Sequence, residues 1–196
     1  IGERALPLDV IDRLADGTIT RVRVIGQGTA AVAGQSTAAI LDELTDSKLD
    51  VDAVTATELS GFGMRLDMSD TLAIAVSQSG TTTDTNRTVD LLRARGAAVI
   101  GIVNRRGSDL TDKSDGVLYT SDGRDVEMSV ASTKAFTAQL SALAALSIAA
   151  GRARGVLSSQ EEGRLVHALM ECPRLIAEAM GAEAQSAAAI VTVPPG

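Results

Sequence analysis

The sequence predicts an α/β fold, a three-layer sandwich in which helices cover both faces of a parallel sheet of about five strands. Short apolar segments alternate with longer helical segments along the chain, as expected for parallel strands joined by crossover helices. Aromatic residues make up only 2% of the chain, so Ala, Val, Leu and Ile must form the core. Right-handed crossovers leave few arrangements, and the doubly wound strand order 2-1-3-4-5 is favoured.

The first half of the chain is expected to begin with a helix at residues 8–14. The apolar segment 21–26 ends at a glycine and predicts the first strand, and an Ala-rich helix follows to about Leu44. The second strand is expected at residues 51–56. A short polar stretch then leads to residues 72–76, whose uninterrupted apolar side chains indicate a strand buried on both faces.

The second half continues the alternation. Its expected elements are a helix at 84–95, a strand at 97–103, a helical turn at 108–113, a strand at 116–120, and helices at 131–150 and 159–180. Gly96 is expected to end the first of these helices, because glycine readily adopts the conformation that closes a helix. Pro173 is expected to kink or break the last helix, because proline lacks the N–H that a helix interior requires.

A chain of 196 residues is long enough for one domain with a full core. We expect that domain at residues 1–182, with a linker or the start of a following domain at 183–196. The chain begins at Ile1 rather than Met and ends just after an apolar segment. We therefore interpret it as a piece of a longer protein.

Charge and composition exclude several classes of partner. The formal net charge is −7 and the sequence contains no run of Lys and Arg. Both observations argue against nucleic-acid binding. The sequence has no apolar run long enough to span a membrane. Cys172 is the single cysteine, so no internal disulfide can form and a reducing cytoplasm is favoured.

Hydroxyl side chains gather directly after the third expected strand. Residues 77–82 read Ser-Gln-Ser-Gly-Thr-Thr, and a helix that Thr83 or Asp84 can cap follows at once. Gly80 permits a tight turn and a close approach of the backbone to a ligand. A helix start and four hydroxyls form a suitable anion site. The alternative is a polar turn that only caps the helix.

The loop after the first strand has an alternative interpretation. Residues 26–31 read Gly-Gln-Gly-Thr-Ala-Ala, which matches a dinucleotide-binding fingerprint. That fingerprint needs an acid at the end of the second strand, but Asp50 and Asp52 lie at its start and Glu58 lies past its end. In the expected strand order this loop adjoins residues 77–82, at the point where the winding reverses and ligands bind.

A third polar segment begins the long helix near the same edge. Residues 127–135 read Glu-Met-Ser-Val-Ala-Ser-Thr-Lys-Ala, at the carboxyl end of the fifth expected strand. They bring Ser132, Thr133 and Lys134 toward the expected site. The same residues are equally compatible with an ordinary first helical turn and a solvated charge.

Together these segments resemble the sugar isomerase (SIS) domain family. Residues 77–85 resemble its phosphosugar loop, and residues 130–140 resemble a segment of glutamine–fructose-6-phosphate aminotransferases. Asn104 and residues 108–115 are similar to the intervening stretch. The resemblance covers about residues 20–150, corresponding to the first isomerase-type half of those enzymes. It implies a metal-free and cofactor-free domain that binds a hexose 6-phosphate in an enzyme making glucosamine 6-phosphate.

The resemblance also implies site residues. The implied substrate-binding residues are Thr29, Ser77, Gln78, Ser79, Thr82, Val130 and Ser132. Glu58 and Glu127 match family acids with a structural or site-supporting role, and Lys134 is a further supporting candidate by its position. Two positions depart from the pattern, since Ala30 replaces a serine and Thr81 replaces an acid.

The catalytic residues stay unassigned, because the family's acid–base groups lie in a second domain of the same type. His167 is expected to be exposed or partly packed, and Cys172 is expected to be a small core residue. We therefore expect no turnover by the chain alone. The helix at 131–150 is apolar on nearly every side, which predicts a homodimer or a tandem partner domain. The alternative function is a module that senses a phosphosugar without converting it.

Overall fold

The computed structural model describes residues 2–121 and 134–191, with side chains described as far as residue 181. The chain divides into two compact units, Ile1–Ser158 and Ser159–Gly196, and each is described by itself. The expected domain limit at residue 182 stays a prediction.

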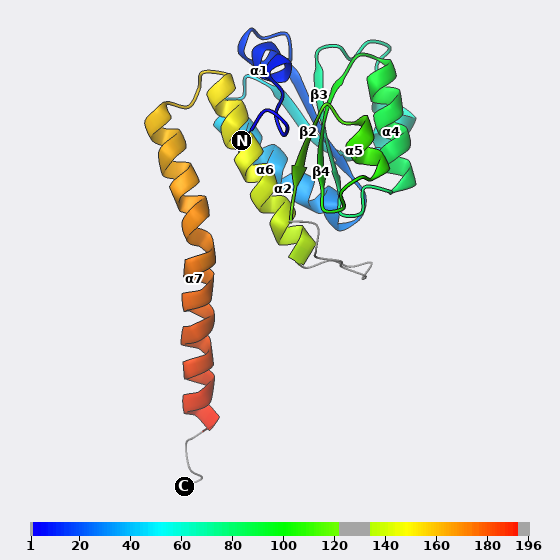
Figure 1. Cartoon of the computed structure of the whole chain (residues 1–196). Coiled ribbons are helices and arrows are strands. Elements are labelled where there is room, and N and C mark those ends of the chain that lie inside the picture. Colours follow the sequence, from blue (N-terminus) through cyan, green and yellow to red (C-terminus); the bar gives the residue numbers. More distant parts are fainter. Residues whose placement is uncertain (1, 122–133, 192–196) are drawn as a thin grey trace. The chain divides into compact units, whose positions relative to one another are not determined.

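A parallel five-stranded sheet forms the centre of the first unit (Figure 1). Its strands are β1 (Arg21–Gly26), β2 (Asp50–Thr55), β3 (Thr71–Ser77), β4 (Ala98–Val103) and β5 (Gly116–Tyr119). The order is β2-β1-β3-β4-β5, and every neighbouring pair is parallel. Every residue of β3 and β4 is buried. The predicted α/β class and the predicted strand order are confirmed.

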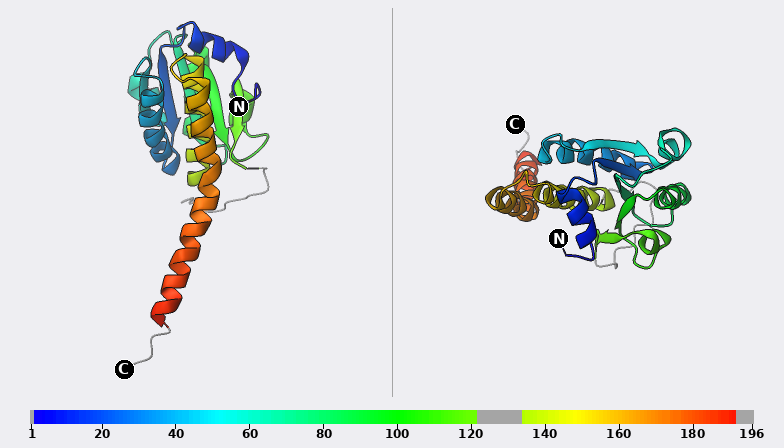
Figure 2. Two further views of the ribbon diagram at one scale, coloured as in Figure 1. Left: turned by 90° about the vertical axis from the view of Figure 1, so that its left-hand side faces the viewer. Right: turned by 90° about the horizontal axis from the view of Figure 1, so that it is seen from above.

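Helices cover both faces of this sheet (Figure 1, Figure 2). One face is covered by α1 (Leu8–Ala15), α2 (Thr29–Leu44) and α6 (Lys134–Ala153), and the other by α4 (Thr83–Ala94) and α5 (Asp109–Lys113). The short helix α3 (Ala56–Glu58) and the π-helical turn η1 (Leu59–Gly63) follow β2. Each face has its own apolar core. One core is centred on Ile74 and Ile100, and the other contains Val89, Leu92 and Val99.

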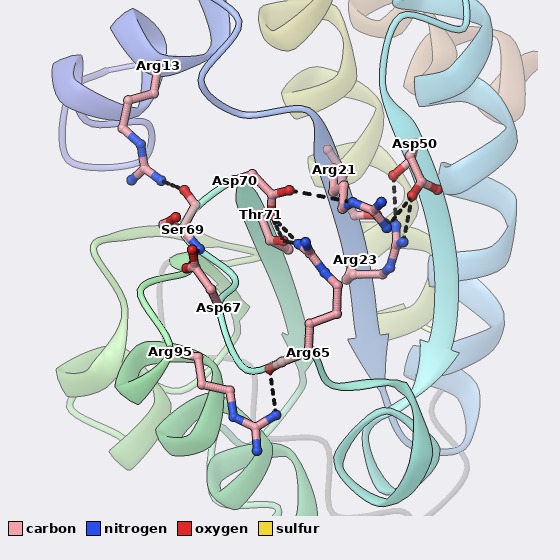
Figure 3. A network of polar contacts seen from close by, with 11 residues as sticks. Arg13, Arg21, Arg23, Asp50, Arg65, Asp67, Ser69, Asp70, Thr71 and Arg95 are labelled. Atoms are coloured by element: carbon pink, nitrogen blue, oxygen red, sulfur yellow. Dashed lines mark hydrogen bonds and ion pairs between the residues drawn. The ribbon is translucent and has the colours of Figure 1, made fainter.

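Arginine and aspartate side chains form a network at the amino edge of the sheet (Figure 3). Arg21 Nη1 lies 2.9 Å from Asp50 Oδ2, and Arg23 Nη2 donates to the same oxygen at 2.9 Å. Asp70 pairs with Arg65, and its Oδ2 lies 3.6 Å from Arg21 Nε. The hydrogen bond from Arg23 lowers the pKa of Asp50. Burial raises the pKa of Asp70, but the hydrogen bond from Arg65 and further contacts outweigh burial and lower it.

The second unit contains the long helix α7 (Ser159–Val191). Pro173 does not break this helix, because α7 continues through it, and the alternative expectation of a kink stays a prediction. Cys172 is also not a core residue, since it is exposed and its thiol donates to Ala168 O at 3.4 Å. None of the helices in the described part of the chain has the length and apolarity that crossing a membrane requires.

Candidate functional site

The candidate site lies at the carboxyl edge of the sheet, beyond β1 and β3. These strands are neighbours, with Ile25 opposite Ala75, so the loops that leave them start side by side. From β1 the chain continues to β2 on one side, and from β3 it continues to β4 on the other side. This is the reversal point at which doubly wound sheets bind ligands.

A tight turn directly after β3 shapes residues 77–82. Gly80 has a φ of +67° in the left-handed region, which glycine adopts without strain. Its N–H donates to Ser77 Oγ at 3.0 Å. An added Cβ at Gly80 would overlap Ser108 Oγ and lie 2.9 Å from Val103 Cγ1. The turn therefore packs tightly against the loop between β4 and α5.

The hydroxyls of this turn are bonded to one another. Thr81 donates twice to Ser79 Oγ, from its N–H at 3.2 Å and its Oγ1 at 3.0 Å. Ser77 Oγ lies 3.3 Å from Thr82 Oγ1. Because Ser79 Oγ already accepts two hydrogen bonds, its own hydrogen must point elsewhere, toward solvent or a ligand.

The carbonyl oxygens of the turn accept hydrogen bonds from the protein. Gln78 O accepts from the N–H groups of Asn104 at 3.1 Å and Arg105 at 3.3 Å. Gly80 O accepts from Leu110 N–H at 3.1 Å and from Asn86 Nδ2 at 3.0 Å. Carbonyl oxygens carry negative partial charge, so bonding them internally suits a loop that faces an anion.

Helix α4 begins at the end of this turn with unused donors. Its N-cap is Thr82, whose side chain makes no capping hydrogen bond, so the expected cap by Thr83 or Asp84 is wrong. The backbone N–H groups of Thr83, Asp84 and Thr85 donate to no acceptor in the part of the chain that the structure describes. The helix dipole places positive partial charge at the same point.

The loop after β1 starts beside this turn, because β1 and β3 are neighbouring strands. Thr29 is exposed at the first position of α2, directly after Gly28 at φ +58°. Ala30, at the position where the resemblance implies a serine, is 8% exposed and packs in the core. Gln27 Nε2 donates to Thr57 Oγ1 at 3.2 Å and links this loop to α3, where Glu58 is exposed.

The third segment is described only from Lys134, which is exposed at the start of α6. Val130, Ser132 and Glu127 lie outside the described residues. The structure thus brings together Ser77, Gln78, Ser79 and Thr82.

One residue of the site was not recognised in the sequence. Asn86 on α4 is 6% exposed and bonds the carbonyls of Gly80 and Thr82. The available signal was its position on the helix face that also carries the buried Val89.

Within residues 2–121 and 134–181, whose side chains the structure describes, no group of three His, Cys, Asp or Glu side chains could hold a metal ion. The dinucleotide alternative gains no support either. Asp50 begins β2 and is paired with Arg21 and Arg23 at the opposite edge, while β2 ends at Thr55. His167 is exposed on α7, as expected.

Comparison with known proteins gives the family. The SIS domain family model matches residues 19–149. Glutamine–fructose-6-phosphate aminotransferase (isomerizing) of Brucella abortus is 41% identical over 170 residues, covering 87% of this chain and 27% of the relative. The enzyme of that name from Thermus thermophilus is 40% identical over 162 residues, covering 83% and 26%. The chain thus spans little more than a quarter of these relatives.

Solved structures of similar fold agree with this family assignment. The C-terminal domain of glucosamine-fructose-6-phosphate aminotransferase from Francisella tularensis matches with a TM-score of 0.78 and 25% identity, over 94% of this chain and 51% of that one. The Escherichia coli CFT073 protein c3406, solved in complex with A5P, matches in fold with a TM-score of 0.60 and 20% identity, over 83% and 85%. The chain belongs to the SIS domain family.

Proposed function

We propose that the chain binds the phosphate group of a hexose 6-phosphate at residues 77–82 and the start of α4. One observation carries this proposal. The turn offers hydroxyls and unused N–H donors at the reversal point of the sheet, while the carbonyl oxygens of Gln78, Gly80 and Thr82 accept hydrogen bonds from the protein. A phosphate needs many donors and no facing acceptors, and the helix dipole adds to the attraction.

The predicted site residues take distinct roles in this proposal. Ser77, Ser79 and Thr82 donate to phosphate oxygens, and Gln78 reaches the ligand from the same turn. Thr29 approaches from the loop after β1. The resemblance assigns the sugar end to Val130 and Ser132, with Glu58 and Glu127 in support. Lys134 is a further supporting candidate by its position at the start of α6.

The expected affinity follows from these bonds. Each charge-assisted hydrogen bond to phosphate contributes about 1.5–3 kcal/mol. After the cost of ordering the ligand and the side chains, several such bonds give a dissociation constant between roughly millimolar and micromolar.

We further propose that the parent protein is an isomerizing aminotransferase that makes glucosamine 6-phosphate from fructose 6-phosphate. The relatives at about 40% identity support this, but the chain spans only part of each. The alternative is a module that senses a phosphosugar without converting it. An assay of the full-length parent for glutamine-dependent glucosamine 6-phosphate formation separates the two, because a sensing module would bind without turnover.

Titration calorimetry with fructose 6-phosphate and glucosamine 6-phosphate tests the site. We expect Ser79→Ala and Thr82→Ala each to weaken binding about tenfold or more, equivalent to about 1.4 kcal/mol. Ser69→Ala is the matched control, because Ser69 is an exposed serine beyond the amino end of the same strand. Unchanged affinity in both site variants would refute the assignment.

The proposed partner is a second copy of the chain or a second domain of the same type. In the described part of α6, only Lys134, Thr137 and Ser141 are exposed. The apolar composition of this helix is therefore no reason by itself to expect a partner. Exposed apolar side chains occur instead along α7, at Val166, Met170, Leu175, Ile176 and Met180. Light scattering at micromolar concentration should give a dimer mass, and a monomer mass would contradict self-association.

A cytoplasmic location also stays a prediction.

A further inference from the structure

Asn86 is a buried amide on the fourth residue of α4, and its side chain reaches back to the turn. Its Nδ2 donates to Gly80 O at 3.0 Å and to Thr82 O at 3.1 Å. Helical side chains point toward the helix N-terminus, so this position is suited to reach the turn. Chemistry fixes the orientation of the amide, because a flipped amide would place its oxygen against two carbonyl oxygens.

Neither of the two carbonyls depends on this amide alone. Gly80 O also accepts from Leu110 N–H at 3.1 Å, and Thr82 O also accepts from the backbone N–H of Asn86 at 3.0 Å. Removing the side-chain amide would therefore leave neither carbonyl without a donor. The other amide atom, Asn86 Oδ1, is buried with no hydrogen-bond partner, which costs stability.

The amide does have a consequence for an anion site. It ties the carbonyls of Gly80 and Thr82 to one donor, and so fixes the last part of the turn onto the first turn of α4. It also neutralises the negative ends of two peptide groups beside the unused N–H donors. Both effects favour a negatively charged ligand over water.

We propose that Asn86 is a positioning residue for the phosphate-binding turn, acting through the Gly80 and Thr82 carbonyls without touching the ligand. This inference rests on the proposed phosphate site and adds a residue that sets its affinity. It gives a reason for a buried amide whose oxygen has no hydrogen-bond partner.

The main test is Asn86→Leu, measured by calorimetry with fructose 6-phosphate and with inorganic phosphate. We expect about three- to tenfold weaker binding of both probes, the effect of one or two ordinary hydrogen bonds. Urea unfolding should show unchanged or higher stability, because the variant removes an unsatisfied buried oxygen. A purely structural amide would instead lower stability and leave affinity unchanged, which would overturn the proposal.

Thr88→Val is the matched control. Thr88 is buried two residues further along the same helix, and its Oγ1 donates to a backbone carbonyl outside the turn, Ala56 O, at 2.8 Å. We expect this variant to lose stability and keep its affinity for both probes. Equal loss of affinity in Thr88→Val and Asn86→Leu would contradict a specific role for Asn86.

Asn86→Asp adds a pH-dependent readout. Its carboxylate would face two carbonyl oxygens, so binding should be weak at neutral pH. Burial and repulsion raise the pKa of such a carboxyl, and the protonated form can donate to one carbonyl. Affinity relative to the unmodified chain at the same pH should therefore recover as the pH falls. No recovery in a variant that remains folded would count against the proposal.

Hydrogen exchange without ligand separates this inference from the proposed function. The amides of Gly80, Thr81 and Leu110 should exchange faster in Asn86→Leu than in Thr88→Val. If the unmodified chain binds neither probe, the phosphate site is refuted, while the exchange data still test whether Asn86 holds the turn in place. Unchanged exchange in Asn86→Leu would refute this positioning role of Asn86 whatever the binding result.

Discussion

Gly80→Ala should strongly destabilise the first unit. Gly80 has a φ of +67°, where an L side chain costs about 1–2 kcal/mol. The added Cβ would overlap Ser108 Oγ, lie 2.6 Å from Ser108 Cβ and lie 2.9 Å from Val103 Cγ1. Overpacking of this kind costs about 1–3 kcal/mol. The two costs together predict a loss of about 2–5 kcal/mol in the free energy of unfolding.

Urea denaturation separates the two costs. Gly155→Ala is the control for backbone strain, because Gly155 has a φ of +69° and an added Cβ would have no heavy atom within 4 Å. We expect this control to lose only about 1–2 kcal/mol. The double variant Gly80→Ala/Ser108→Gly should recover part of the overpacking cost, because it removes the Ser108 side chain that the added Cβ would overlap. Removing this side chain breaks no hydrogen bond, since Ser108 Oγ has no partner.

Two results would refute this reasoning. One is a loss in Gly80→Ala no larger than that in Gly155→Ala, with equal denaturant dependence. The other is a double variant no more stable than Gly80→Ala, which would show that Ser108 does not confine the turn.

Four further predictions concern the rest of the chain. The pKa of Asp50 is lowered from its ordinary value of 3.8, chiefly by the hydrogen bond from Arg23. Its stabilisation should therefore be complete above that value and disappear as the pH falls through the lowered pKa. Acid unfolding of Asp50→Asn should show a smaller loss over this range, and an identical profile would contradict the ion pair. Pro173→Ala should stabilise α7, because an interior proline costs about 3 kcal/mol, and unchanged helical circular dichroism on heating would argue against this. Thr81→Val should weaken fructose 6-phosphate binding less than Ser79→Ala, because Thr81 only orients the Ser79 hydroxyl, and calorimetry giving the reverse order would exchange their roles. A coupled assay for glucose 6-phosphate should detect no turnover of fructose 6-phosphate by the 196-residue chain, and turnover above background would place the catalytic base within it.

The sheet could be predicted because each strand has a strong local signal. Residues 21–26 end in a glycine and were predicted with the limits that β1 has. The buried strand β3 extends one residue past its predicted limit at each end, and β4 begins one residue later than predicted. The parallel order followed from the crossover rule, which depends on chain topology rather than on side-chain detail.

Features that depend on tertiary contacts could not be read from the sequence. Asn86 is a polar residue in a polar segment, and only the fold shows that it faces the turn. Thr82 is the N-cap, although Thr83 and Asp84 have residue types that suit this position equally well. The predicted end of α7 at residue 180 was wrong, because the helix continues past Gly181 to Val191 and residues 182–191 contain no glycine or proline. Pro173 costs helix stability without ending the helix. Cys172 was predicted to be buried from its residue type alone.

Amide NMR titration with fructose 6-phosphate tests the central claim most directly. The phosphate-binding proposal predicts that the largest saturable shifts come from the amides of residues 78–85, with a smaller response at Thr29. The amides of Arg21, Asp50 and Asp70 at the opposite edge of the sheet should not respond. Largest shifts at that amino edge, or no saturable shift at millimolar ligand, would contradict the proposed site.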